Sequence, residues 1–333
     1  MNSLAIRVDG NKYIGYGHFS RCLSIANYFI QQKVKVDFIV SSDSTVSSLD
    51  KKQSLIILKK TTYNAWNSEE MLSIFKKKKY DCLLVDSYYP DKHIIESISR
   101  FTKVFYIDDN YSIDFLVTGI INYNIEANVA KYKHTLPIKY FLGPRFFPLN
   151  HRFIKMKKKN NAVLIATGST DSNKVAYKIA ERLASKNLTE TFYILIGIFY
   201  DEEYINEIHK LTKTYQNIKL LEWGDDFYDN FSSFKLVIGP GSTILYEALC
   251  LGIPCLSFSF VDNQKIECEA LDSLNIARYV GSVFNTEDFL KKLANDFTVQ
   301  IDPKNLASKQ IYNRRFFDRH GLKRIFQAIC SNT

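Results

Sequence analysis

A glycine-bearing stretch near the start of the chain, "YIGYGHFSRC" at residues 13–22, carries residue types that suit base catalysis. It follows an apolar run and precedes a segment of helical spacing, so Gly15 and Gly17 fall where the backbone must turn tightly and leave room for a ligand. His18 then stands at the start of a helix, where the positive end of the helix dipole disfavours an imidazolium. A neutral imidazole accepts a proton, so His18 is a candidate general base, although the same position also suits a helix cap.

Asp9, which precedes this stretch, and further residues within the stretch complete the candidate site. Asp9 follows the preceding apolar run, and we expect it to orient either His18 or a reacting water. Arg21 lies one helical turn beyond His18, and we expect it to pair with a carboxylate or hold the loop rather than contact phosphate. Together with Gly15, Tyr16 and Gly17, Arg21 is placed on the substrate-binding side of the predicted site.

A second glycine turn, in "VIGPGSTILYEALCLGIPCLSF" at residues 237–258, suits an anion. A helix that begins at Ser242 presents free backbone N–H groups and a positive dipole end, which bind a diphosphate without a metal ion. We therefore assign Gly241, Ser242 and Thr243 to a nucleotide diphosphate. Glu247, further along the helix, is placed to accept from a ribose hydroxyl pair, and an exposed helical glutamate is the alternative.

A third small-residue turn, "ATGSTDSNK", again follows an apolar run and supplies Gly168, Ser169 and Thr170 as further anion ligands. The chain has no D-x-D motif in a metal-binding context, so we expect neither a metal ion nor any other cofactor. Two pairs of adjacent aspartates are interpreted as caps or turn residues: Asp108 and Asp109, and Asp225 and Asp226.

The segments around these turns alternate between short apolar runs and helical spacing, which indicates parallel sheets covered by helices. The apolar runs are "LAIRVD", "VDFIV", "SLIIL", "DCLLVD", "KVFYID", "AVLIATG", "TFYILIG", "IKLLEW", "KLVIG" and "IPCLSF". Helices are expected at "SEEMLSIFKK", from about Asn173, Glu202, Ser242 and Asn263, and throughout the C-terminal region. Pro144 and Pro148 interrupt the alternation within residues 139–161. We predict an α/β protein of two Rossmann-like doubly wound domains facing a cleft, residues 1–145 and 146–333.

Composition narrows the class of protein. The 333 residues include 46% hydrophobic and 24% charged residues, which is typical of a globular chain. Neither a signal pattern nor an apolar run of about 20 residues is present, so we expect a cytoplasmic protein without membrane insertion. The net charge of +9 reflects lysine runs without interleaved aromatic residues, so nucleic acid is not an expected partner. The oligomeric state stays open. The scattered cysteines are interpreted as reduced core residues: Cys22, Cys82, Cys250, Cys255, Cys268 and Cys330.

These motifs together resemble the PseG family of UDP-2,4-diacetamido-2,4,6-trideoxy-β-L-altropyranose hydrolases and its SpsG-like relatives. The N-terminal signature residues are Arg7, Asp9, Ile14, Gly15, Gly17, His18, Arg21, Cys22, Leu23 and Ala26. Further blocks follow in the family order: "VDSYYPD", "YIDDN", "IINYN", "LGPRFFPLNHRF", "TGSTD", "GPGSTILYEALCLGIPCLSF" and "VDNQ". The run from Thr167 to Thr170 departs from the family, which usually shows two glycines before its serine or asparagine, and Pro240 replaces a small residue.

The resemblance implies a GT-B-type fold related to MurG, in which the C-terminal domain holds UDP and the N-terminal domain faces the sugar. It places the catalytic histidine at His18, and it places Asn263 and Gln264 near the sugar or the diphosphate. The implied reaction is hydrolysis of a UDP-sugar in pseudaminic acid biosynthesis. Water attacking the anomeric carbon directly inverts its configuration, and UDP leaves without a strong general acid.

Two other function classes remain open at this stage. A GT-B glycosyltransferase would use the same UDP pocket and would also admit an acceptor. A non-catalytic nucleotide-sugar-binding subunit would keep the Ser242 turn and have no need of His18. The sequence leaves open which sugar is bound, whether the nucleotide is strictly UDP, and what surface glycan, if any, the product serves.

Overall fold

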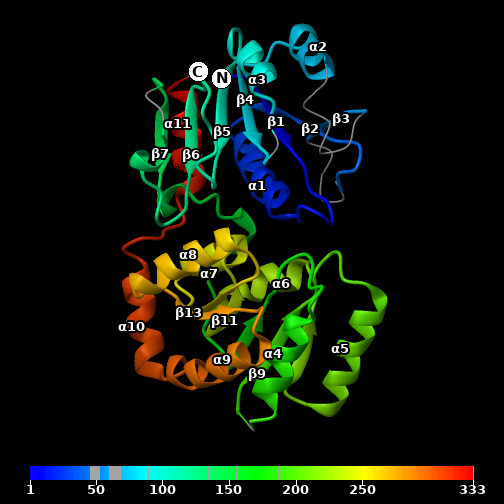
Figure 1. Ribbon diagram of the computed structural model, residues 1–333, viewed down its shortest axis with the longest axis vertical. Helices are drawn as coiled ribbons and strands as arrows, with labels where there is room; N and C mark the ends of the chain where they lie inside the picture. Colours follow the sequence, from blue (N-terminus) through cyan, green and yellow to red (C-terminus); the bar gives the residue numbers. More distant parts are fainter. Residues whose placement is uncertain are drawn as a thin grey trace. The chain divides into compact units, whose positions relative to one another are not determined.

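The computed structural model describes residues 1–45, 53–59, 69–88, 90–133, 136–154, 156–186 and 188–332. It divides into two units, each built on a parallel sheet (Figure 1). The first unit comprises Met1–Leu149 and His320–Thr333, and the second comprises Asn150–Arg319. Two parallel α/β units with the predicted alternation of strand and helix confirm the predicted fold class.

The first unit has its strands in the order β3-β2-β1-β4-β5-β6-β7, and neighbours run parallel wherever the structure describes them. Helix α1 packs with β1, β2 and α11, whereas α2 and α3 share an apolar core with β4 and β5. The elements are β1 (Ser3–Val8), α1 (Gly17–Gln31), β2 (Lys35–Val40), β3 (Ser54–Ile57), α2 (Glu69–Lys77), β4 (Cys82–Asp86), α3 (Lys92–Ser99), β5 (Lys103–Ile107), β6 (Gly119–Asn122), η1 (Val129–Lys131), β7 (Lys139–Leu142), η2 (Pro144–Phe146) and α11 (Gly321–Cys330).

The second unit has the strand order β10-β9-β8-β11-β12-β13, again with parallel neighbours among the described residues. Its core joins the strands to α4, α5 and α9. The elements are η3 (His151–Ile154), β8 (Ala162–Ile165), α4 (Val175–Ala184), β9 (Thr191–Leu195), α5 (Glu202–Thr214), β10 (Ile218–Leu221), α6 (Asp225–Asn230), η4 (Phe231–Ser233), β11 (Leu236–Pro240), α7 (Thr243–Cys250), β12 (Cys255–Ser259), α8 (Asp262–Ser273), β13 (Arg278–Ser282), α9 (Thr286–Gln300) and α10 (Pro303–Asn313).

The last helix differs from the sequence prediction, which put all of residues 146–333 in the second domain. The chain passes to the second unit after Leu149 and returns at His320, so α11 is part of the first unit. Helix α11 belongs to the first unit because its apolar side chains pack on α1. The ring centroids of Phe326 and of Phe29 in α1 lie 5.0 Å apart. Gly321 packs so closely on the Phe147 backbone that a side chain would overlap it.

Both sheets reverse their direction of growth at one position, where a ligand site is expected. In the first unit β2 and β3 lie on one side of β1, whereas β4 and the following strands lie on the other. In the second unit β9 and β10 lie on one side of β8, whereas β11 and the following strands lie on the other. In the first unit, the segments after β1 and β4 therefore lie together at the carboxyl edge of that sheet. In the second unit, the segments after β8 and β11 lie together at the carboxyl edge of the other sheet.

Two other predictions concern the described residues as a whole. All six cysteines are free thiols, five of them buried, which confirms the interpretation as reduced residues. None of the helices that the structure describes is long and apolar enough to cross a membrane.

Candidate active site and anion-binding turns

The turn before α1 sets His18 at the carboxyl edge of the first sheet. Gly15 has a φ of +79°, a conformation that disfavours a side chain, and its N–H donates to the Asn11 carbonyl at 2.8 Å. Tyr16 is the N-cap of α1 and caps it with no side-chain hydrogen bond, and the helix proper begins at Gly17. The cap interpretation of His18 is therefore wrong, because His18 lies inside the helix and its ring bonds elsewhere.

His18 bonds to Asp86, a carboxylate at the end of the neighbouring strand β4. The His18 Nδ1 lies 2.5 Å from Asp86 Oδ1, and both residues are buried. A carboxylate only accepts, so the hydrogen bond to Asp86 requires the proton on Nδ1 and leaves the lone pair on Nε2, while the Arg21 Nη2 donor also lies 2.9 Å from Nδ1. The pair has the arrangement of a histidine base and its orienting carboxylate.

Arg21 joins Asp86 to residues that follow β5 and β6. Its Nε and Nη2 atoms donate to the Asp86 carboxylate at 2.5 and 2.6 Å, and its Nη1 donates to Asp109 at 3.0 Å and to the Tyr123 hydroxyl. Burial favours the protonated acid, yet Arg21 and His18 hold the pKa of Asp86 well below its ordinary range. Arg21 thus pairs with carboxylates, as expected, and keeps Asp86 ionised.

Asp9 bonds to residues other than His18, so the first of its two predicted roles is not supported. Its carboxylate pairs with Arg7 at 2.7 Å and accepts from the Ser41 N–H and the Ser44 hydroxyl, each at 2.7 Å. These partners lie on β1 and after β2, whereas His18 bonds toward β4. The orienting carboxylate is therefore Asp86. Burial raises the pKa of Asp9, but Arg7 and these hydrogen bonds lower it further, so its net shift is downward.

None of the residues that complete the histidine cluster was predicted as a site residue from the sequence, and Asp109 was interpreted there as a cap or turn residue. Asp86 and Tyr88 come from "VDSYYPD", and Asp109 and Tyr123 come from "YIDDN" and "IINYN". The Tyr88 ring meets the His18 ring edge-on, with centroids 4.5 Å apart and planes at 83°. An aspartate ending the strand beside β1 was the available signal, because parallel strands end at one edge.

The two pairs of adjacent aspartates lie in turns or at a helix start. Asp108 accepts from the N–H groups of Ser112 and Ile113, both at 3.2 Å, so its interpretation as a turn residue is confirmed. Asp109 lies in the bend after β5, which fits the turn interpretation, and its side chain also pairs with Arg21 at 3.0 Å. In the second unit, Asp225 and Asp226 stand in the first turn of α6, which fits their predicted place.

The turn between β11 and α7 presents the predicted amides. A Cβ on Gly241 would lie 2.8 Å from both Cys268 Sγ and the Gln264 carbonyl oxygen, so only glycine fits against α8. Ser242 is the N-cap of α7 and makes no side-chain capping bond. The first N–H groups of α7, beginning at Thr243, are consequently available to an anion.

Glu247 lies on the same helix and is buried rather than exposed. Its exposed fraction is 6%, and its carboxyl group makes no hydrogen bond or ion pair with any residue that the structure describes. Burial alone raises the pKa of Glu247 to about 8. The exposed-glutamate alternative is therefore wrong, because Glu247 is a buried residue of α7, about one turn beyond the start of the helix at Thr243.

The start of α8 lies against this turn. The Gln264 side-chain oxygen accepts from the Phe260 N–H at 2.9 Å, which ties the side chain to its own loop. The exposed Asn263 side chain accepts from the Gln264 N–H at 2.9 Å. The structure thus brings Gln264 next to Gly241, as the motifs require, and leaves the amide of Asn263 at the surface.

The turn after β8 is adjacent to these residues, because β8 and β11 are paired neighbours. Gly168 has a φ of +106°, and no atom lies within 4 Å of the place where its Cβ would be. Asp171 ends the turn and accepts from the N–H groups of Val175 and Ala176, both at 2.8 Å, at the start of α4. Gly168, Ser169 and Thr170 thus lie beside the α7 turn at the reversal point of the sheet.

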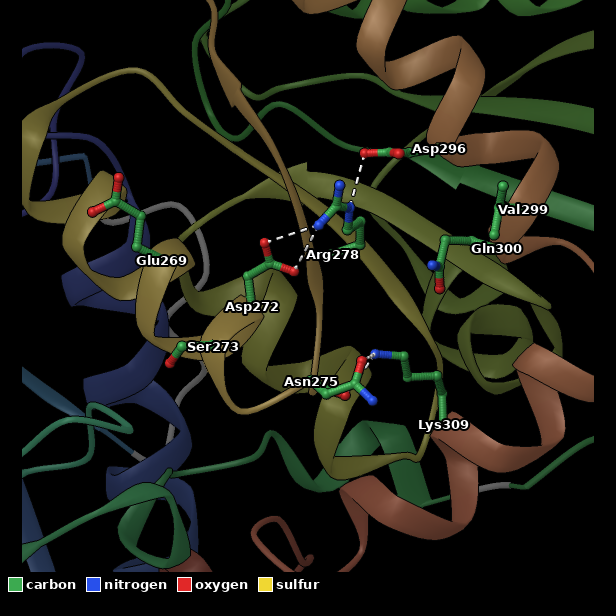
Figure 2. A pocket seen from close by; sticks show the side chains of 9 residues that line it. All are labelled: Glu269, Asp272, Ser273, Asn275, Arg278, Asp296, Val299, Gln300 and Lys309. Carbon is green, nitrogen blue, oxygen red and sulfur yellow. Dashed lines mark hydrogen bonds and ion pairs between the residues drawn. The ribbon is translucent and has the colours of Figure 1, made fainter.

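A hollow of about 560 Å³ on the second unit lies elsewhere (Figure 2). Arg278 there bonds to Asp272 and Asp296, and Lys309 Nζ donates to the Asn275 carbonyl at 2.6 Å. Both cations are already bonded to the chain, and none of the predicted site residues lines this hollow. No group of three or more His, Cys, Asp or Glu residues in the described part of the chain is arranged to hold a metal ion.

Comparison with known proteins gives relatives in sequence. No family model matches the chain. An uncharacterized protein of Methanocaldococcus jannaschii is 28% identical over 75% of this chain. The spore coat polysaccharide biosynthesis protein SpsG of Bacillus subtilis is 23% identical over 78% of each chain. A Helicobacter pylori protein, pseudaminic acid cytidylyltransferase and UDP-2,4-diacetamido-2,4,6-trideoxy-β-L-altropyranose hydrolase, is 23% identical over 89% of this chain. The chain spans about half the length of the first and third, 54% and 50%.

Solved structures give the fold. MurG of Acinetobacter baumannii superposes with a TM-score of 0.70 at 14% identity and covers 99% of this chain. A UDP-glucosyltransferase of Polygonum tinctorium gives a TM-score of 0.67 at 10% identity over 98% of the chain. These relatives and structures confirm the predicted resemblance to PseG- and SpsG-like proteins and the GT-B-type fold.

Proposed function

We propose that this protein is a nucleotide-sugar hydrolase that releases UDP from UDP-2,4-diacetamido-2,4,6-trideoxy-β-L-altropyranose. The observation that carries the proposal is His18, held by the buried Asp86 so that its Nε2 keeps a lone pair. Resemblance to the H. pylori relative, whose name includes that hydrolase, supports the substrate.

The first unit supplies the base in this proposal. Water attacks the anomeric carbon with its oxygen lone pair, its proton passes to His18 Nε2, and the bond from that carbon to the UDP oxygen breaks with its electrons leaving on UDP. The configuration inverts, because a single displacement takes place. Asp86 stabilises the imidazolium that forms, and the proton then passes to solvent. Such a base contributes about 10²- to 10⁴-fold.

The second unit supplies the nucleotide site in this proposal. The amides at the start of α7 and in the turn after β8 bind the diphosphate and stabilise its charge as it leaves. The Glu247 carboxyl, buried and unbonded among the described residues, accepts from the ribose hydroxyls. Asn263 and Gln264, at the start of α8, lie next to the sugar or the diphosphate.

The test is release of UDP from the UDP-sugar with no acceptor present. His18→Asn removes the basic nitrogen, so kcat should fall by about 10² or more while UDP affinity stays within about twofold. His93→Asn, an exposed histidine on α3, is the matched control and should behave as wild type. Near wild-type turnover of His18→Asn would remove His18 as the base, and loss of UDP binding would contradict the division of roles between the units.

A glycosyltransferase is the second candidate, and the likeness to MurG and to the P. tinctorium UDP-glucosyltransferase favours it. Such an enzyme releases UDP mainly when an acceptor is added, and the sugar then appears on the acceptor. UDP release that depends on an acceptor would support this candidate, whereas a free reducing sugar formed in stoichiometry with UDP supports the hydrolase.

A further inference from the structure

The loop after β9 packs beneath the turn that follows β8. The Phe199 N–H donates to the Ser169 carbonyl at 3.0 Å. The Tyr200 hydroxyl bonds to the Thr167 hydroxyl, at the start of the same turn. Gly197 is buried between them. The turn at 167–170 is therefore held by a second loop that the proposed function has not used.

Gly197 leaves no space for a side chain under this turn. A Cβ at residue 197 would lie 2.6 Å from the carbonyl oxygen of Gly168 and 2.6 Å from that of Ser169. Ordinary contacts of a Cβ begin near 3.4 Å; the two carbonyls are backbone atoms, and the Tyr200 ring atom Cε1 would lie nearer still. Any side chain at residue 197 would therefore force two successive peptide groups of the turn to rotate or withdraw.

The positions of those two carbonyls fix where the amides of the turn point. In a trans peptide the C=O and the following N–H point in opposite directions, and the described chain has no cis peptide bond. Because the carbonyls of Gly168 and Ser169 point toward Gly197, the N–H groups of Ser169 and Thr170 point away from it. Neither amide donates a hydrogen bond to a residue that the structure describes.

We propose that Gly197 and Tyr200 are positioning residues, which hold the 168–170 turn so that the Ser169 and Thr170 amides bind the diphosphate of the nucleotide. Two adjacent N–H groups pointing the same way suit phosphate oxygens, which only accept. The Tyr200–Thr167 bond holds the first residue of the turn, and the absent side chain at Gly197 lets the carbonyls point inward. The inference rests on the proposed function for the identity of the ligand.

The test compares three probes on two glycine variants. Gly197→Ala should weaken the binding of UDP and of inorganic pyrophosphate at least tenfold by calorimetry, with uridine binding unchanged, because uridine carries no phosphate. Gly224→Ala is the matched control on the same unit: its φ of 168° is extended, no atom lies within 4 Å of its Cβ position, and all three affinities should match wild type.

A second variant keeps the test decisive if Gly197→Ala does not fold. Tyr200→Phe keeps the ring and removes only the bond to Thr167, so UDP and pyrophosphate should bind at least about threefold more weakly, again with uridine unchanged. The proposal is overturned if both variants bind pyrophosphate as wild type does, or if uridine affinity falls in parallel.

The wild-type protein separates this inference from the proposed function. If it binds pyrophosphate in a Gly197-dependent manner but binds neither UDP nor uridine, the positioning role stands and the UDP-sugar hydrolase proposal fails. If it binds UDP and no variant changes the affinity, the hydrolase proposal stands and the positioning role fails. Binding of neither UDP nor pyrophosphate overturns both.

Discussion

Replacing Glu247 with glutamine should change the pH dependence of stability. Burial raises the pKa of this carboxyl from 4.5 to about 8 in the folded protein, so the unfolded chain releases the proton first. Stability therefore falls as the pH rises through the interval between these two values, by about 1.4 kcal/mol for each pH unit. Wild type should lose up to about 3 kcal/mol between pH 5 and pH 8 through this residue, and Glu247→Gln should lose none of it.

Urea unfolding followed by circular dichroism at pH 5, 6, 7 and 8 measures this slope. The quantity that decides is the difference in unfolding free energy between Glu247→Gln and wild type at each pH, because it cancels the titration of all other groups. The exposed Glu202 on α5 provides the control, and Glu202→Gln should follow the wild-type curve. At pH 8 and above, where the Glu247 carboxyl is at least half ionised, Glu247→Gln should bind UDP up to about tenfold more weakly, since a charge-assisted bond becomes a neutral one.

Glu247→Gln should raise the free energy of unfolding at pH 8 relative to wild type and lower the affinity for UDP, and these opposite signs make the prediction specific. A residue that only fills space would give parallel curves in pH and no loss of UDP affinity. If the difference between Glu247→Gln and wild type stays constant from pH 5 to pH 8, Glu247 does not titrate as a buried, unbonded acid and the reasoning fails. If the slope changes and UDP affinity does not, Glu247 is buried without serving the nucleotide.

Three further predictions concern the first unit and the reaction. Asp86→Asn should lower kcat by about 10² to 10⁴ with UDP affinity unchanged, because His18 loses the acceptor that fixes its tautomer; near-normal turnover would remove Asp86 from the mechanism. Asp9→Asn should instead lower stability at pH 7 by about 3 kcal/mol and leave kcat of the folded protein unchanged, since it breaks a buried ion pair. The pKa of Asp9 lies below 3.8 in the folded protein, so its stabilisation is present above pH 4 and the difference from wild type should shrink as the pH falls to 3. Hydrolysis should proceed in EDTA, because the proposed diphosphate site uses backbone amides; activity lost in EDTA and restored by Mg²⁺ or Mn²⁺ would contradict this.

The strands and glycine turns were predictable because their signals are local. Buried parallel strands appear as continuous apolar runs, as in "CLLVD" of β4, whose residues are all buried. The turns at Gly15 and Gly168 have a positive φ, and a glycine after an apolar run predicts such a turn because glycine adopts a positive φ readily. Strands β6, β7 and β13 escaped prediction: β7 and β13 are partly buried edge strands, and β6 is buried but only four residues long.

The carboxylate on His18 and the return of the last helix were not predictable in this way. Asp86 is 68 residues from His18 and reaches it only because β4 pairs with β1, which is a fact of strand order. Asp9 directly follows β1 and is much nearer to His18 in sequence than Asp86 is. Its side chain nevertheless bonds toward the residues after β2. Helix α11 belongs to the first unit through contacts that are distant in sequence, of Phe326 with Phe29 and of Gly321 with the Phe147 backbone.

The two candidate sites differ in how their polar groups are satisfied, and this difference supports the assignment of roles. Around His18 the charged groups bond to one another: Asp86 to Arg21, and Arg21 to Asp109. A base needs such a fixed surrounding, because it must keep one tautomer and one orientation. At the turns of the second unit, by contrast, amide donors and the buried Glu247 acceptor find no partner among the described residues. The residues of these turns are half-exposed, so in the proposed function their amides are open to the oxygens of a diphosphate, and the Glu247 carboxyl accepts from the ribose hydroxyls.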